Sequence, residues 1–289
     1  MNSYIILLFM AIFPVIVLCN YIYKKDTNKE PIHLLILIFV LGFIMALPVI
    51  YIELVLDGVF PTENVKDFYQ LFINIFFSIA LVEEGAKWII TQKVGYSNKE
   101  FDEIYDIIIY SVFASLGFAC IENIFYVLSN GLFVAIVRGF LSVPGHMCFG
   151  VLMGYFLAKA KVSSIHRNQK LYYKNIFLSI VIPSLVHTLY DTLLYYSSVE
   201  HPLTMLAIFL VLFIILFIIC FKIVNYVSNI QRKLYIRNTL TNSDYTKCPI
   251  CGYHVGKYNY CGNCGYKMKW LYFFFYWEFT SFVILLNIV

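Results

Sequence analysis

The feature that most constrains this chain is a series of long apolar runs, each separated from the next by a short polar segment. The runs cover residues 3–23, 32–56, 68–92, 104–128, 132–158, 174–197 and 202–226, and an eighth is possible at 270–289. A helix needs about 20 apolar residues to cross the hydrocarbon core of a bilayer. The sequence therefore predicts an all-α polytopic membrane protein, built as a bundle of seven or eight transmembrane helices.

The balance of charged and apolar residues excludes an ordinary soluble domain. Only 13% of the 289 residues are charged and 61% are hydrophobic, whereas soluble domains average about 25% charged residues. The first run has no charged segment before it beyond the terminal amine and no small-residue cleavage site, so we expect a retained helix and not a signal peptide. The lipid bilayer is thus an expected partner, and nucleic acid is not.

Loop charges predict how the chain is oriented. Lysine and arginine gather in loops 24–31 and 159–174, between the third and fourth runs, and after residue 221, all on one face if the spans alternate. The opposite loops are acidic or neutral. Because cytoplasmic loops carry the excess of positive charge, we expect a multi-pass protein of a bacterial cell membrane with its N-terminus outside and its C-terminal polar segment in the cytoplasm.

Ionisable residues inside the runs are the candidates for function, since a charge at the bilayer centre costs about 2.5 kcal/mol or more. The third run contains Glu83 and Glu84, with Lys87 one helical turn from both. One glutamate can then face a central site while the lysine neutralises the other. The alternative is a helix end at the cytoplasmic interface, with Lys87 extending toward water.

The fourth run contains Glu122 and Asn123, with Phe118 one turn earlier. Small residues nearby, at 114, 115, 117 and 119, predict close approach of a neighbouring helix. An interfacial helix end is the alternative for Glu122 and Asn123. The run boundaries place Glu122 nearer the outer face than Glu84, which is a tension for any shared site.

The fifth and sixth runs contribute histidines. His146 follows Pro144 and Gly145, where the proline is expected to kink the helix. His187 and Asp191 are four residues apart on one helical face, so the carboxylate can hold the imidazole in one tautomer. Either histidine could instead serve only to hydrogen-bond a neighbouring helix. We expect Arg138 to extend toward water or to pair with a carboxylate.

Together these residues resemble PrsW-type membrane proteases, which belong to a wider group with the CAAX prenyl endopeptidases and the Abi proteins. The resemblance rests on EExxK from Glu83 to Lys87, FxxxEN from Phe118 to Asn123, the later His146, and HxxxD from His187 to Asp191. In the wider group, arginine and histidine replace Lys87 and Glu122. The similarity covers roughly residues 30–200. It implies a helical bundle with an active site inside the membrane, and cleavage of a single-pass, membrane-anchored anti-sigma factor in a stress response.

Two mechanisms are compatible with this residue set. The expected catalytic residues are Glu83, Glu84, Glu122, His146, His187 and Asp191, supported by Lys87, Phe118 and Asn123. In one, Glu83 or Glu84 activates water and His187 stabilises the oxyanion or donates a proton. In the other, His146, His187 and Glu122 bind a catalytic zinc. Rival functions are a non-catalytic receptor or immunity protein, and a proton-coupled transporter.

The polar tail has a separate cysteine pattern. Two CxxC pairs, Cys248 with Cys251 and Cys261 with Cys264, predict a structural zinc ribbon. A pair of disulfides is the alternative, which a reducing cytoplasm disfavours. We therefore expect a transmembrane protease domain over 1–228, a cytoplasmic zinc ribbon over 229–269, and a final transmembrane or interfacial helix over 270–289.

Overall fold

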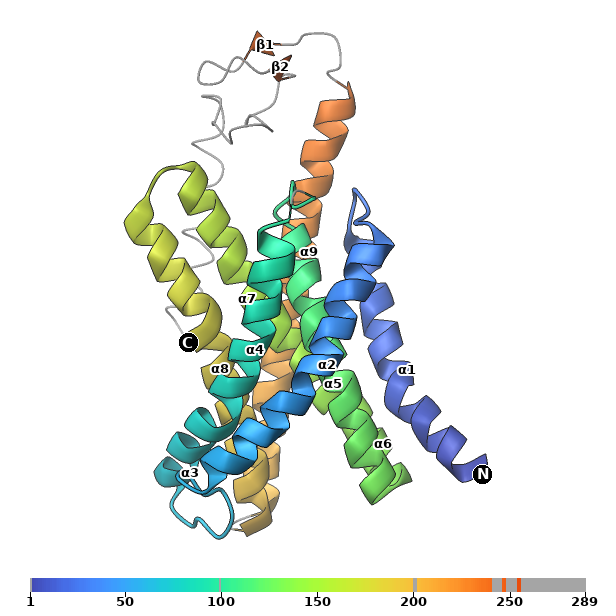
Figure 1. Cartoon of the computed structure of the whole chain (residues 1–289), viewed down its shortest axis with the longest axis vertical. Coiled ribbons are helices and arrows are strands. Elements are labelled where there is room, and N and C mark those ends of the chain that lie inside the picture. The colour runs from blue at the N-terminus through green and yellow to red at the C-terminus, as the bar shows by residue number, and fades with distance from the viewer. Residues whose placement is uncertain (1, 99, 200–201, 241–245, 248–253, 256–289) are drawn as a thin grey trace.

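The computed structural model describes residues 2–98, 100–199, 202–240, 246–247 and 254–255, and nearly all of these are helical (Figure 1). The elements in chain order are α1 (Asn2–Lys25), α2 (Ile32–Asp57), α3 (Phe68–Ile75), η1 (Phe76–Ala80), α4 (Leu81–Ile90), η2 (Thr91–Tyr96), α5 (Asp106–Asn130), α6 (Leu132–Phe140), α7 (Ser142–Ile165), α8 (Gln169–Val199), α9 (Pro202–Leu240), β1 (Thr246–Lys247) and β2 (His254–Val255). The two short strands pair antiparallel, with Thr246 opposite Val255.

Among the described residues, six helical segments are long and apolar enough to cross a membrane. This confirms the prediction of an all-helical polytopic protein, although the number of spans differs from the sequence estimate. The predicted third span is helical, but it is divided into α3, η1, α4 and η2. The predicted seventh span ends at 226, whereas α9 continues to Leu240. The possible eighth span and the four tail cysteines lie outside the described residues.

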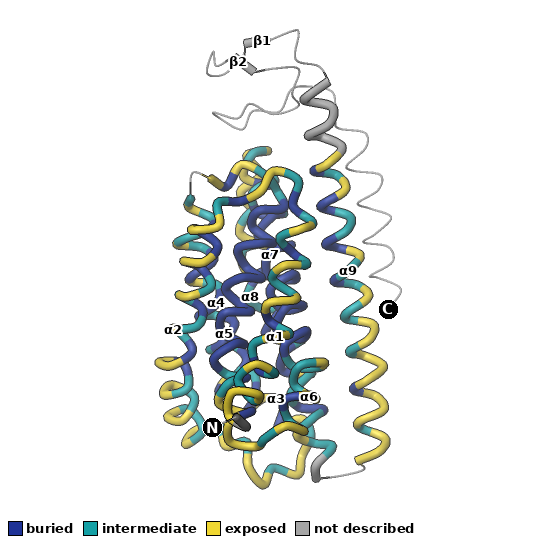
Figure 2. Tube along the Cα trace, turned by 90° about the vertical axis from the view of Figure 1, so that its right-hand side faces the viewer, coloured by how far each residue is buried: buried dark blue, intermediate teal, exposed yellow. Residues whose placement is uncertain are grey.

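The central helix of the bundle is α5, which packs against α1, α2 and α7. Most of its residues are buried, and Figure 2 shows α5 and α7 as a buried core with more exposed helices around them. The close approach predicted for the small residues of α5 occurs against α2. A Cβ on Gly117 would collide with the carbonyl oxygen of Phe39, and one on Gly42 with that of Ala114. Glycine is therefore required on both helices.

Large apolar side chains cover the outer surfaces of the peripheral helices. Leu54 on α2, Phe133 on α6 and Leu203 on α9 are each more than two-thirds exposed within the bundle. Figure 2 shows α9 standing along one flank with an exposed outer side. Such a surface would be costly in water but suits contact with lipid chains.

The predicted fifth span is interrupted at Leu141, between α6 and α7. Leu141 has φ −115° and ψ −61°, away from the usual helical values. Pro144 lies in the first turn of α7, where its missing N–H would otherwise have bonded to the carbonyl of Phe140. The kink expected at Pro144 therefore occurs three residues earlier, at the end of α6.

Two π-helical segments bracket α4. The segment η1 precedes Leu81 and η2 follows Ile90. Each π turn holds more residues than an α turn and so rotates the helix relative to its regular course. Glu83, Glu84 and Lys87 on the intervening α4 are all buried, so the whole charged group faces the bundle.

Candidate active site

A cavity of about 620 Å³ opens inside the bundle, between α2, η1, α4, α5, α6, α7 and α8. Its charged and histidine lining comes from six of these elements: Glu53, Glu83, Glu122, Arg138, His146, His187 and Asp191. The helices that the sequence singled out therefore contribute their polar residues to one space. The spatial gathering of these side chains was the central expectation from the sequence.

Lys87 lies at the centre of the charged group and is fully buried. Its Nζ donates to Glu83 Oε2 at 2.8 Å and to Glu84 Oε1 at 2.7 Å. It also lies 3.1 Å from His146 Nδ1 and 4.4 Å from the centre of the Phe118 ring. The lysine thus binds both glutamates and not one, and its burial excludes the alternative in which it extends toward water.

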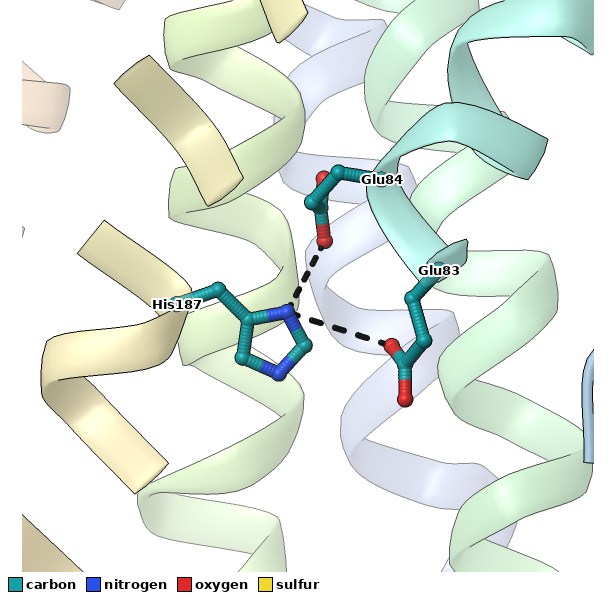
Figure 3. A group of neighbouring side chains, drawn as sticks. All are labelled: Glu83, Glu84 and His187. Carbon is teal, nitrogen blue, oxygen red and sulfur yellow. Dashed lines mark hydrogen bonds and ion pairs between the residues drawn. The ribbon is translucent and has the colours of Figure 1, made fainter. Parts of the chain in front are cut away.

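The two adjacent glutamates occupy different environments. Glu83 lines the cavity, whereas Glu84 is fully buried behind it. Figure 3 shows both carboxylates directed toward His187, whose Nδ1 lies 3.2 Å from Glu84 Oε1 and 4.0 Å from Glu83 Oε2. Glu84 Oε2 is buried with no hydrogen-bond partner. Of these two glutamates, Glu83 is therefore the one whose side chain lines the cavity.

His187 is fixed from both sides of its ring. Its Nε2 lies 3.3 Å from Asp191 Oδ2, one turn further along α8, and the Phe149 ring stacks on it with centroids 4.5 Å apart. Asp191 thus stands where a carboxylate would orient the imidazole, as the spacing predicted. The ring can rotate little without losing these contacts.

The partners of His146 indicate which of its nitrogens carries a proton. An ammonium can only donate, so the contact from Lys87 makes Nδ1 the acceptor and leaves the proton of the neutral ring on Nε2. That nitrogen points to Glu122 Oε2 at 2.9 Å, although the alignment falls short of a hydrogen bond. The backbone carbonyl of His146 accepts from Ser115 Oγ, which ties α7 to α5.

Glu122 is held by an arginine from α6. Arg138 Nη2 donates to Glu122 Oε1 at 2.7 Å, and Arg138 Nε donates to Asn123 Oδ1 at 3.1 Å. Asn123 donates in turn to the carbonyl of Ala11 on α1. This confirms the expected pairing of Arg138 with a carboxylate. It also places Glu122 beside His146 within the cavity. Glu122 can therefore share a site with Glu83, although the run boundaries placed it nearer the outer face.

One acidic residue of the cavity was missed from the sequence. Glu53 of α2 lines the cavity, and its Oε1 is buried with no hydrogen-bond partner. It lies within the second apolar run, three residues before its predicted end. The signal was therefore the same as for Glu83 and Glu122, but a position close to the span boundary made it resemble a solvated helix end.

The donor atoms are suited to a metal ion, but in a different grouping from the predicted zinc ligands. Among the described residues, Glu83, Glu84 and His187 place donor atoms within 4.8 Å of one another, and so do Glu83, Glu122 and His146. Because Lys87 occupies the lone pair of His146, the first group is the one whose imidazole nitrogen, His187 Nδ1, has only carboxylates beside it. In that group Asp191 supports the second nitrogen of His187, as is usual for a metal-bound histidine, and Glu84 Oε2 is free.

Comparison with known proteins identifies a matching family. A family model described as "PrsW family intramembrane metalloprotease" matches residues 30–220. The curated Protease PrsW of Oceanobacillus iheyensis is 41% identical over 184 residues, or 64% of this chain and 80% of that protein. Those of Bacillus subtilis and Clostridioides difficile are 40% and 36% identical, over 80% and 79% of their lengths and 64% and 65% of this chain. No solved structure matches.

Proposed function

Because the chain belongs to the PrsW family of intramembrane proteases, and is therefore a multi-span bacterial membrane peptidase, we propose that it cleaves a single-pass membrane protein of the anti-sigma-factor type. The substrate class follows from the resemblance seen in the sequence. Its cleavage would occur at the cavity formed by α2, α4, α5, α7 and α8. A membrane protein substrate in the bilayer is what an intramembrane protease requires.

The observation that carries the assignment of the site is the convergence of carboxylates and imidazoles on one cavity inside the bundle. Hydrolysis of a peptide bond needs an activated water, donors for the oxyanion and an acid for the leaving amine. Carboxylates and imidazoles can supply all three roles. Water admitted to the cavity would meet these groups directly.

We assign water activation to Glu83. It lines the cavity while Glu84 does not, and its Oε2 is anchored by Lys87. The remaining carboxylate oxygen can accept a proton from a water molecule in the cavity. Glu84 then acts as a positioning residue, since it binds both Lys87 and His187.

The two histidines provide the donors. The Nε2–H of His146 faces the cavity side, beside Glu122. His187, held by Asp191 and Glu84, has a carboxylate beside each of its nitrogens. We assign oxyanion stabilisation to His146 and protonation of the leaving amine to His187.

A divalent metal fits the same site, with Glu83, Glu84 and His187 as its ligands. When bound, it would polarise the scissile carbonyl and acidify a water molecule. Glu83 would then be occupied, and the proton acceptor would be Glu122. Its Oε2 lies 2.9 Å from His146 Nε2, while Arg138 holds its Oε1.

Purified protein in lipid vesicles with a reporter transmembrane substrate distinguishes these accounts. We expect Glu83→Gln, His187→Ala and Glu122→Gln each to reduce kcat by 100-fold or more, about the lower range for lost general acid–base catalysis. The metal content of the purified variants distinguishes the metal-dependent mechanism from the metal-free one. In the metal-dependent route, Glu83→Gln and His187→Ala lose the ion while Glu122→Gln keeps it.

Cleavage at an undiminished rate after removal of all metal would assign water activation to Glu83 alone. Glu63→Gln is the matched control, because this exposed glutamate lies in the loop between α2 and α3, away from the cavity. If the Glu83→Gln variant and the His187→Ala variant both cleaved the substrate at the wild-type rate, the proposed site would be refuted.

For the tail, we propose that Cys248, Cys251, Cys261 and Cys264 form a structural cytoplasmic zinc ribbon, separate from catalysis. The matched family region ends at residue 220, before these cysteines. The pairing of β1 with β2 lies around the first CxxC pair and is compatible with a hairpin. Cys248→Ser should release tail-bound zinc and leave cleavage intact. Loss of cleavage by an inserted, abundant Cys248→Ser protein would contradict the separation.

A further inference from the structure

A second cluster of acidic residues lies at the other end of α5 from Glu122. Asp26 and Glu30 belong to the segment between α1 and α2, and Asp102, Glu103 and Asp106 to the segment that enters α5. Figure 1 shows both connections at the same end of the bundle. Asp106 and Glu122 are 16 residues apart on one helix, or about 24 Å at 1.5 Å per residue. The cluster is therefore separate from the cavity.

Three of these carboxylates converge. Asp26, Glu103 and Asp106 place donor oxygens within 4.8 Å of one another. Asp106 is fully buried and Asp26 is 4% exposed. Each of the three also has a buried oxygen without a hydrogen-bond partner: Asp26 Oδ1, Glu103 Oε2 and Asp106 Oδ1. Unpartnered carboxylate oxygens at such burial are costly unless something binds them.

The other oxygens of the two aspartates are fixed by the backbone. Asp106 Oδ2 accepts from the N–H groups of Asp102 at 3.1 Å and Glu103 at 2.6 Å. Asp26 Oδ2 accepts from the N–H of Glu30 at 3.0 Å. These bonds hold each carboxylate in one orientation and leave its second oxygen free. The arrangement is thus preorganised toward a common point.

Basic side chains do not neutralise the group. Lys29, three residues after Asp26, donates to the backbone carbonyls of Tyr23 and Asp26, and Lys25, next to Asp26, donates to Asn225. Within the described part of the chain, none of the three carboxylates has an ion pair with lysine or arginine. Burial and neighbouring acidic groups raise the pKa of Glu103 to about 7, and burial raises the pKa of Asp26 although Lys29 opposes the shift. Lys29 is therefore close enough to act on Asp26 through its charge, but it makes no direct ion pair with the three carboxylates.

We propose that Asp26, Glu103 and Asp106 bind one hard divalent cation, Mg²⁺ or Ca²⁺. Such ions prefer sites made only of oxygen ligands, and this group has no imidazole or thiolate. Glu30 and Asp102 also approach Asp106 closely and add negative charge at the rim. The bound cation would tie the α1–α2 connection to the start of α5.

The cation would also stabilise the position of α9. Glu103 is hydrogen-bonded to Gln231, Ser228 Oγ donates to the carbonyl of Lys25, and Lys25 Nζ donates to Asn225. All three α9 residues are therefore attached either to the last residue of α1 or to the segment that enters α5. Binding would lock three segments that are distant in sequence, and this role does not depend on the proposed proteolysis.

The test uses the full chain in detergent, stripped with a chelator and titrated separately with Mg²⁺ and Ca²⁺ at constant ionic strength. We expect one of these ions to raise the unfolding midpoint temperature saturably. Mn²⁺, counted by electron paramagnetic resonance, should occupy a site that survives in His187→Ala. The ion count should fall by one per chain in Asp106→Asn.

Asp106→Asn is informative because an asparagine oxygen still accepts the two backbone N–H bonds while the charge is lost. It should unfold at or above the wild-type temperature in chelator, and below it with the cation. If this variant does not accumulate, the half-buried Glu103→Gln carries the same test. Glu63→Gln should respond as wild type does. A cation-induced shift that survives Asp106→Asn and Glu103→Gln, or no shift in wild type, would overturn the proposal.

Discussion

At the scale of single residues, the site consists of buried charges that are each held by another charge. Lys87 binds two glutamates, Arg138 binds Glu122, and His187 lies between Glu84 and Asp191. Removal of one partner from a buried pair costs more than the pair itself contributes, because the remaining charge is left without compensation. The residues of the site are therefore mutually dependent for folding as well as for chemistry.

Lys87→Met tests this dependence. The change should lower the free energy of unfolding by about 3–5 kcal/mol, because it leaves two buried carboxylates without their cation. Thermal unfolding of the detergent-solubilised protein measures the loss. Adding Glu84→Gln to Lys87→Met should recover part of it by removing one uncompensated charge.

Lys93→Met provides the comparison, since Lys93 is an exposed lysine six residues further along the same helical segment. It should unfold close to the wild-type temperature. Equal stability of the two variants would mean that the Lys87 contacts do not support the fold.

At the scale of elements, the position of the site depends on how α4 and α5 are seated. The π turns at η1 and η2 set the rotation of α4, and direct contact between α2 and α5 brings Glu53 and Glu122 to the same cavity. Glycine makes that contact possible, because Gly42 and Gly117 let each backbone meet a carbonyl of the other helix. A small displacement of α2 would therefore change both packing and the cavity wall.

Gly42→Ala is expected to separate α2 from α5. The added Cβ meets the backbone carbonyl of Ala114, which cannot move aside as a side chain can. Overpacking of this kind costs about 1–3 kcal/mol, so the unfolding temperature should fall and cleavage with it.

Gly85→Ala is the control, because a Cβ at Gly85 has no neighbour within 4 Å and alanine favours the helix by about 1 kcal/mol. Its unfolding temperature should equal or exceed that of the wild type. A Gly42→Ala protein as stable as Gly85→Ala would contradict the close helix contact.

At the scale of the whole molecule, the bundle has a buried centre and an apolar exterior. Polar side chains are gathered in the interior and at the two ends, while α1, α2 and α9 present leucine, isoleucine and phenylalanine outward. The α2–α3 connection lies at one end of the bundle and the α7–α8 connection at the other (Figure 1). From the loop charges, we propose that the second of these ends is cytoplasmic.

Cysteine labelling tests that orientation. Glu63→Cys should react with a membrane-impermeant maleimide in intact cells, and Lys170→Cys only after permeabilisation, because both residues are exposed, Glu63 in the α2–α3 connection and Lys170 in the first turn of α8 at the opposite end. The unsubstituted chain gives the background from its own cysteines. The reverse pattern would place the N-terminus and the α2–α3 connection inside the cell.

The sequence by itself determined the membrane class, the family and most of the residues of the site, because a charge within an apolar run is costly and therefore conspicuous. It did not determine how those charges pair. Lys87 with His146, and Glu122 with Arg138 and His146, are contacts between helices, and helical spacing describes neighbours on one helix only.

Only the tertiary structure separated the roles of adjacent residues. Glu83 lines the cavity and Glu84 is fully buried, because η1 and η2 set the rotation of α4. The tertiary structure also brought Glu53 to the cavity and Asp26 to Asp106. Each of these outcomes depends on the packing of segments far apart in the chain, for which local pattern carries no information.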